Sequence, residues 1–125
     1  MTDHLHTLDD QGEPVPCEDG TRWALWYGGS AARRVVRQQS FLSPKTGHVV
    51  YISTVFLGID HAFMGGPSIL WETMVFQGDD TREQRRYRSK AEAIEGHNQL
   101  VRAYGGTPLG ESQPGVVRAP RGWLR

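Results

Sequence analysis

Residues Val49–Phe76 read VVYISTVFLGIDHAFMGGPSILWETMVF, and this stretch decides the fold. In Val49–Leu57 both alternating sets of side chains are apolar, which indicates a central strand covered on both faces. Ile69–Gln77 is a second apolar run and predicts the partner strand. The Gly58–Ser68 segment between them is polar and rich in glycine, so we expect a hairpin with a tightly folded loop.

One residue of this hairpin does not fit its surroundings. Glu72 alternates with Leu70, Met74 and Phe76, so its carboxylate lies on an apolar strand face. A charge there is costly unless it is paired, hydrogen-bonded or directed into a cleft. If the loop closes symmetrically, Thr54 or a near neighbour lies opposite Glu72 and offers a partner.

The segment before the hairpin predicts a short helix and a strand. Asp19 or Thr21 can cap a helix that ends at Gly28-Gly29. Its aromatic residues share one face, which indicates a helix pinned to a sheet or a stacking platform for a base or sugar: Trp23, Trp26 and Tyr27. We expect residues 33–39 to form a strand, followed by a turn at Ser43–Gly47.

The same strand carries a basic cluster of Arg33, Arg34 and Arg37. Two interpretations are open for it. The arginines are explained by a solvated edge strand protected by charge. They could instead contact phosphate.

The segment after the hairpin predicts a last strand and a last helix. Glu83–Arg88 is the strand, and Ser89-Lys90-Ala91-Glu92 is a capping box that opens a helix running to about Tyr104. The sequence therefore predicts an α+β domain: a four-stranded, mainly antiparallel meander with a short N-terminal helix and a longer C-terminal helix on one face. We divide the chain into an extended arm (1–17), this domain (18–104) and a flexible tail (105–125).

Composition limits the function classes. The chain has 125 residues with 14 basic and 14 acidic side chains, and this balance argues against a dedicated nucleic-acid binder. Cys17 is the single cysteine, which excludes an internal disulfide and favours a reducing compartment. No secretory signal is recognisable, and the apolar run Val49–Ile59 is too short to cross a bilayer. We expect a cytoplasmic protein that does not enter a membrane.

Asp60, His61, Glu72 and His97 are the candidate catalytic residues. A carboxylate with histidines suits general acid–base catalysis or a divalent metal, for which His61, Glu72 and His97 are the candidate ligands. Their spacing matches no specific metal motif, and no phosphate-binding or dinucleotide-binding fingerprint is present. A structural interpretation remains open, in which Asp60 fixes the loop, His61 bonds to Glu72, and His97 is a satisfied histidine under the last helix.

Seven motifs are spread along the chain: D-x-x-G-E-P-V-P from Asp9, W-A-x-W from Trp23, S-T-V-F-L-G-I-D-H-x-F from Ser53, G-G-P from Gly65, E-T-M-V-F from Glu72, R-Y from Arg86, and E-A-x-x-G-H from Glu92. Together they resemble the motifs of a family of small uncharacterised proteins from tailed bacteriophages and prophages. The resemblance covers about residues 9–104. It implies a phage or prophage origin and a role in the cytoplasm of the bacterial host, but no mechanism.

Three function classes follow. The first is a phage accessory protein that binds a host or viral macromolecule, for example as an inhibitor of a host enzyme or defence complex. The second is a small metal-dependent hydrolase, and the third is a virion or assembly component. For the first class a protein partner is expected, and the candidate binding residues are Trp23, Trp26, Arg33, Arg34, Arg37, Phe63 and Met64.

Overall fold

The computed structural model of the protein describes residues 4–109, so the predicted tail falls outside the described residues from residue 110 onward. The elements are β1 (His6–Leu8), β2 (Pro14–Pro16), α1 (Gly20–Gly29), α2 (Ala31–Arg34), β3 (Val35–Leu42), β4 (Val49–Phe56), β5 (Trp71–Gln77), β6 (Asp80–Tyr87) and α3 (Lys90–Ala103). Strands β3–β6 form a four-stranded antiparallel sheet in sequential order. The α+β class and the meander are confirmed.

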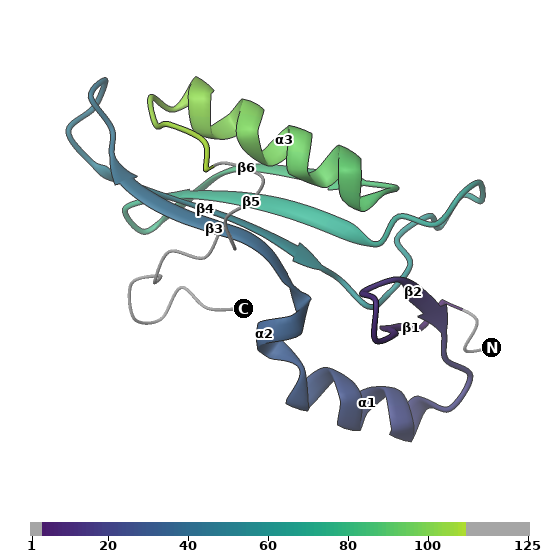
Figure 1. The fold of residues 1–125 in the computed structure, drawn as a ribbon. Coiled ribbons are helices and arrows are strands. Elements are labelled where there is room, and N and C mark those ends of the chain that lie inside the picture. The colour runs from purple at the N-terminus through teal and green to yellow at the C-terminus, as the bar shows by residue number, and fades with distance from the viewer. Residues whose placement is uncertain (1–3, 110–125) are drawn as a thin grey trace.

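Helix α3 covers one face of this sheet (Figure 1). It begins where predicted, since the Ser89 side chain accepts from the Glu92 backbone N–H. Its apolar stripe packs on two groups of buried residues. One contains Val50, Ile52, Val75, Leu100 and Val101, and the other contains Phe56, Leu70, Trp71 and Ala93.

Strand β4 is the centre of the sheet. All of its residues from Val50 to Phe56 are buried, as its double-sided apolar pattern predicts. Its register with β5 places Thr54 opposite Thr73 and Val55 opposite Glu72. The alternation of a strand then puts Thr54 and Thr73 on the α3 side and Glu72 on the other side. This register determines which polar groups meet in the core.

Two boundaries differ from the prediction. Arg33 and Arg34 close the short helix α2, in which Arg34 N–H donates to the Ser30 carbonyl, so β3 begins only at Val35. Strand β6 begins at Asp80 rather than Glu83, because Gly78 adopts a φ of 61° and reverses the chain within a very short turn. The β5–β6 hairpin is longer than its charged sequence suggested.

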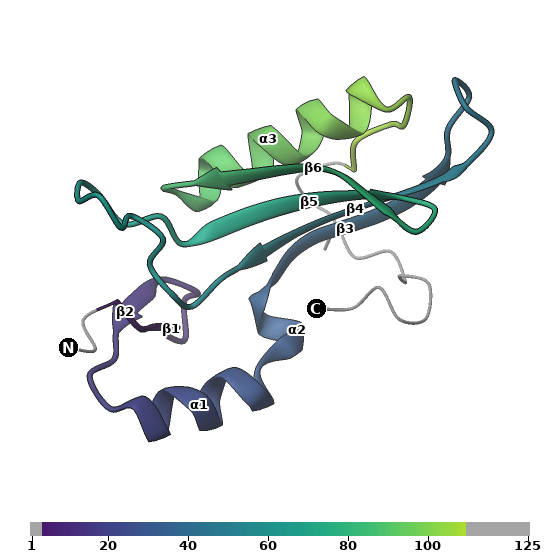
Figure 2. The ribbon, with the colours of Figure 1, turned by 180° about the vertical axis from the view of Figure 1, so that it is seen from behind.

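The N-terminal segment packs against the end of the sheet together with α1 (Figure 2). Residues 6–16 form the antiparallel pair β1–β2, and Leu5 bridges to Ile59 in the β4–β5 loop. Helix α1 begins at the predicted cap, where Asp19 accepts from the N–H groups of Thr21 and Arg22. No helix among the described residues is long and apolar enough to cross a membrane.

Gly96 is the point at which Tyr87 passes α3. A Cβ atom at residue 96 would lie 2.3 Å from the Tyr87 hydroxyl oxygen and 2.4 Å from its Cε1. The helix therefore needs glycine at this position, although glycine has a low helix propensity. The contact joins α3 to the end of β6.

We predict that Gly96→Ala destabilises the protein by about 1–3 kcal/mol, because the new methyl group forces the Tyr87 ring out of its place. Gly28→Ala in α1 is the matched control, since a Cβ atom there meets nothing within 4 Å. That substitution is expected to be neutral or to stabilise by up to about 1 kcal/mol. Urea unfolding monitored by circular dichroism measures both. Equal changes in the two variants would contradict the packing account.

Candidate functional site

The β4–β5 loop, residues 57–70, projects beyond the end of the sheet (Figure 1). Backbone hydrogen bonds fix its base on both sides. Leu57 N–H donates to the Leu70 carbonyl at 2.7 Å, and His61 N–H donates to the Ile69 carbonyl at 2.9 Å. The N-terminal segment adds bonds from His6 N–H to the Gly58 carbonyl at 2.8 Å and from Asp60 N–H to the His4 carbonyl at 2.7 Å.

Asp60 braces the inside of this loop. Its Oδ1 accepts from the backbone N–H groups of Ala62 at 2.8 Å and Ile69 at 2.9 Å. Burial raises the pKa of Asp60, but these N–H donors outweigh that effect and hold the pKa below its ordinary value. The carboxylate therefore works as an Asx-turn acceptor that ties the two arms of the loop together.

Trp23 of α1 joins the base of the loop to the N-terminal segment. The Trp23 indole N–H is shared between the His6 carbonyl at 3.0 Å and the Gly58 carbonyl at 3.1 Å. Gly58 has a φ of 77°, and a Cβ atom there would lie 3.3 Å from Tyr27 and 3.4 Å from Trp23. Only glycine suits this backbone conformation beneath two stacked rings.

The tip of the loop presents two apolar side chains to solvent. Phe63 is 76% exposed and Met64 is 99% exposed. A bond from Gly65 N–H to the Ala62 carbonyl at 3.0 Å closes the turn that carries them. The His61 ring lies 5.4 Å from the Phe63 ring, while Arg88 donates to the Pro67 carbonyl on the returning arm. The tip is thus an apolar pair on a braced support.

The four candidate catalytic residues do not converge. Asp60 and His61 lie in the loop, where His61 Nδ1 is 2.8 Å from the Ile59 carbonyl. Glu72 accepts from Gln84 Nε2 at 2.5 Å and from Arg86 Nε at 3.2 Å, both on β6. The structural interpretation had paired His61 with Glu72, but His61 bonds to the Ile59 carbonyl and Glu72 to its cross-strand neighbours on β6. Thr54 also does not serve Glu72, since it points to the opposite face.

His97 lies on that opposite face, under α3, with none of its surface exposed. Its Nδ1 is 2.7 Å from Thr54 Oγ1, and its Nε2 is 3.0 Å from Gln39 Oε1. Both ring nitrogens are engaged inside the core, and the sheet separates the ring from Glu72. Among residues 4–109 no three His, Cys, Asp or Glu side chains lie close enough together to hold a metal ion.

Most of the candidate binding residues have structural contacts. Trp26 packs edge-on against Phe56, with ring centroids 6.1 Å apart. Arg34 is buried with its guanidinium 3.7 Å from the centre of the Tyr27 ring. Arg37 is buried and donates to the Leu109 carbonyl at 3.0 Å, while Arg33 is exposed and donates to the Asp9 carbonyl. The α1 aromatic face therefore pins the helix, and two of the three arginines are not solvated.

Sequence reasoning missed the polar residues that meet in the core. Gln39, Thr73 and Tyr87 join Thr54 and His97 in one chain of hydrogen bonds. The sequence contains only a weak indication of this hydrogen-bonded chain. Thr54 and Thr73 are polar residues within otherwise apolar strand faces, and only the register of β4 against β5 shows that they are opposite each other.

We predict that Asp60→Ala loosens the loop, because the partly buried backbone N–H groups of Ala62 and Ile69 lose their acceptor. Amide exchange at Ala62 and Ile69 should accelerate at least tenfold, and stability should fall by about 1–2 kcal/mol. Asp60→Asn is the matched control, since its Oδ1 still accepts and its effect should be smaller. Hydrogen exchange followed by NMR measures the loop directly. Unchanged exchange in Asp60→Ala would show that the loop does not depend on this brace.

Comparisons with protein-family models, with curated proteins and with solved structures found no match for this chain. The resemblance to phage proteins therefore stays a prediction from the sequence motifs.

Proposed function

We propose that the protein acts by binding another protein, and that Phe63 and Met64 at the tip of the β4–β5 loop make the central contact. The observation that carries this proposal is the exposure of both side chains on a loop whose base is hydrogen-bonded to the backbone of the N-terminal segment and to the Trp23 side chain of α1. Aromatic and methionine side chains are enriched in the cores of protein interfaces. Exposed apolar residues gathered at one site mark interaction surfaces more often than scattered ones.

The contacts that fix the β4–β5 loop contribute to its affinity for a partner protein. Burying a phenylalanine or methionine side chain is worth about 1.5–3 kcal/mol each. A mobile loop would lose part of this gain when it became ordered, whereas a loop already fixed by Asp60, Trp23 and Gly58 has less entropy to lose. Two anchor residues on a rigid support therefore suit insertion into an apolar pocket of a partner.

The motif resemblance supports the kind of partner. A small phage accessory protein in the bacterial cytoplasm would meet host enzymes and defence complexes, and an anchor loop suits an inhibitor that occupies a pocket. The hydrolase class is less well supported, because the four candidate catalytic residues are distributed over the loop and both faces of the sheet. The binding proposal needs no such convergence.

One observation favours the assembly class as a second candidate. Leu42 and Val49 are opposite each other in the β3–β4 register and are 66% and 45% exposed. They lie at the other end of the sheet from the β4–β5 loop, so residues 4–109 expose apolar side chains at both ends of the sheet, as an assembling subunit requires. Native mass spectrometry of the purified protein over a range of concentrations tests this class, and a lasting monomer would contradict it.

The binding proposal is tested by placing a photo-crosslinking phenylalanine analogue at position 63 and producing the protein in bacterial cells. The same analogue at Leu25, which is 75% exposed on α1, is the matched control. We expect a cross-linked protein that depends on position 63. The same products from both positions, or none from position 63, would contradict the proposal.

The protein identified in this way is then purified and its affinity is measured by calorimetry. Phe63→Ser with Met64→Ser should weaken binding by at least about 30-fold, because each anchor at an interface centre is worth about 1–2 kcal/mol or more. Leu25→Ser should leave the affinity unchanged. Equal dissociation constants for the double variant and the wild type would overturn the assignment of the loop.

A further inference from the structure

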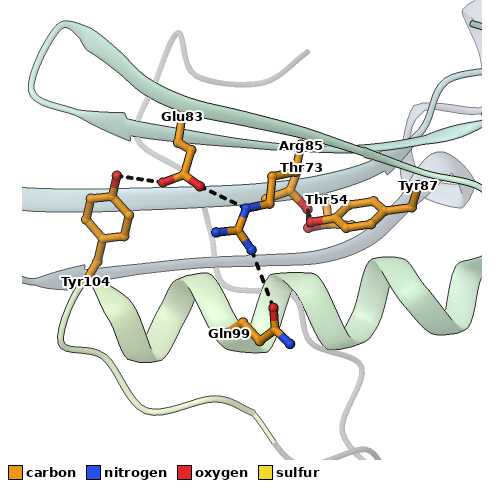
Figure 3. Close-up of polar contacts among 7 residues, drawn as sticks. All are labelled: Thr54, Thr73, Glu83, Arg85, Tyr87, Gln99 and Tyr104. Carbon is orange, nitrogen blue, oxygen red and sulfur yellow. Dashed lines mark hydrogen bonds and ion pairs between the residues drawn. The ribbon is translucent and has the colours of Figure 1, made fainter.

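Polar groups from the four strands of the sheet, from α3 and from the segment after α3 meet in one continuous hydrogen-bonded chain. The distances between donor and acceptor atoms are 3.0 Å for Tyr87–Thr73, 2.5 Å for Thr73–Thr54, 2.7 Å for Thr54–His97, 3.0 Å for His97–Gln39 and 3.0 Å for Gln39–Thr107. Figure 3 shows the Tyr87 end, where the ring reaches across to Thr73 and Thr54. Thr54, Thr73 and His97 have no exposed surface.

The far end of the chain fixes the direction of every bond. The Thr107 carbonyl can only accept, so the Gln39 amide group donates to it and turns its oxygen toward His97. His97 Nε2 must then carry the proton and donate to that oxygen. In a neutral ring Nδ1 is left as an acceptor, and it accepts from the Thr54 hydroxyl.

The same logic continues through the hydroxyl groups. Thr54 uses its proton on His97, so it accepts from Thr73 at their 2.5 Å contact. Thr73 in turn accepts from the Tyr87 hydroxyl. The Thr54 and Thr73 hydroxyls therefore each donate once and accept once, and all bonds run in one direction from Tyr87 to Thr107.

The positive charge of Arg37 near His97 disfavours protonation of the His97 ring. Arg37 of β3 is buried, and its guanidinium is bound to Asn98 of α3 at 3.4 Å and to the Leu109 carbonyl at 3.0 Å. From β4 the neutral hydroxyl of Thr54 bonds to the ring, and from β5 the neutral hydroxyl of Thr73 bonds to Thr54. On β6, Tyr87 ends the chain, while Glu83 and Arg85 bond to each other and to Tyr104 and Gln99 (Figure 3).

Protonation of His97 would reverse half of this chain. A proton on Nδ1 turns that nitrogen into a donor, so the Thr54 hydroxyl proton loses its acceptor and either stays unpaired or turns to Thr73. In the second case Thr73 donates to Tyr87 and the Tyr87 hydroxyl proton is the one that loses its acceptor, so in both cases one hydroxyl of the chain is left without an acceptor. Tyr87 lies against Gly96 of α3, so the disturbance reaches the contact that joins α3 to β6.

We propose that this chain is a proton-sensitive latch between α3 and the sheet, in which His97 holds α3 closed when neutral and releases it as a local unit when protonated. The release follows from the hydroxyl that loses its acceptor in the chain and from the buried Arg37 charge beside the ring. The latch acts on α3 and is independent of the loop assigned to partner binding.

The pH range of the latch follows from the pKa of His97. Burial, and then the positive charge of Arg37, lower this pKa to about 4 from the ordinary value of 6.5. An opened α3 exposes the ring, which then binds a proton that the closed form excludes. Closure is therefore fully stable above about pH 6.5 and weakens as the pH falls toward 4.

The test is amide hydrogen exchange of the full chain at several pH values between 6.5 and 4.5, corrected for intrinsic exchange rates. We expect α3 amides to lose protection by about tenfold per pH unit, which is the slope for uptake of one proton. Their protection should fall below that of β4 amides, because α3 opens alone. Parallel loss in α3 and β4, or no pH dependence in α3, would overturn the latch.

His97→Gln supplies the variant, because a neutral amide can donate and accept without binding a proton. Its α3 protection should be independent of pH over the same range. His48→Gln is the matched control at an exposed histidine of the β3–β4 turn, and it should keep the wild-type slope. A slope that persists in His97→Gln would contradict the role of this ring.

A measurement on the wild type keeps the proposal testable if the variant fails to fold. Proton–nitrogen correlation spectra distinguish the two ring nitrogens of His97. We expect a protonated Nε2 and an unprotonated Nδ1 at pH 6.5. A ring protonated on Nδ1, or one that titrates near 6.5 as a solvated imidazole does, would overturn the assigned direction of the chain.

Discussion

The register between β4 and β5 is the constraint on which the rest of the structure depends. It sets Thr54 opposite Thr73 and Val55 opposite Glu72. A shift of β5 by one residue would exchange the two faces of that strand, moving Thr73 away from α3 and the Glu72 carboxylate beneath it. Neither polar group would then find its partners, and an unpaired carboxylate under α3 would be costly to bury. The position of α3, the hydrogen bonds of His97 and the geometry of the β4–β5 loop all follow from this single pairing.

The sequence predicted those parts of the fold that local signals control. The double-sided apolarity of β4, the Asp19 and Ser89 caps, and the turn before Val49 are each readable within a few residues. Helix α2 was missed because four residues give too little periodicity to recognise. The start of β6 at Asp80 was missed because charged residues on an edge strand resemble a turn in composition.

The candidate site was less predictable, since it depends on which residues approach from a distance. Glu72 was correctly identified as an unusual residue on a strand face, yet its partners Gln84 and Arg86 lie on the next strand and carry no distinctive pattern. One interpretation of the sequence made Arg34 and Arg37 solvated charges. In the structure both are buried, Arg34 against the Tyr27 ring and Arg37 bonded to the Leu109 carbonyl. Conversely, the exposure of Phe63 and Met64 could be suspected only from the glycines that follow them.

The bridge between Leu5 and Ile59 has a consequence for the order of folding. The meander and α3 are built from neighbours in sequence, whose contacts close short loops and form early. The base of the β4–β5 loop is different, because it is completed by positions 4–6 and 23, which must return over a long stretch of chain at a larger entropic cost. The sheet can therefore be assembled while the loop is still open. Phe63 and Met64, the most exposed large apolar side chains among residues 4–109, thus acquire their fixed positions last, after the core that supports them.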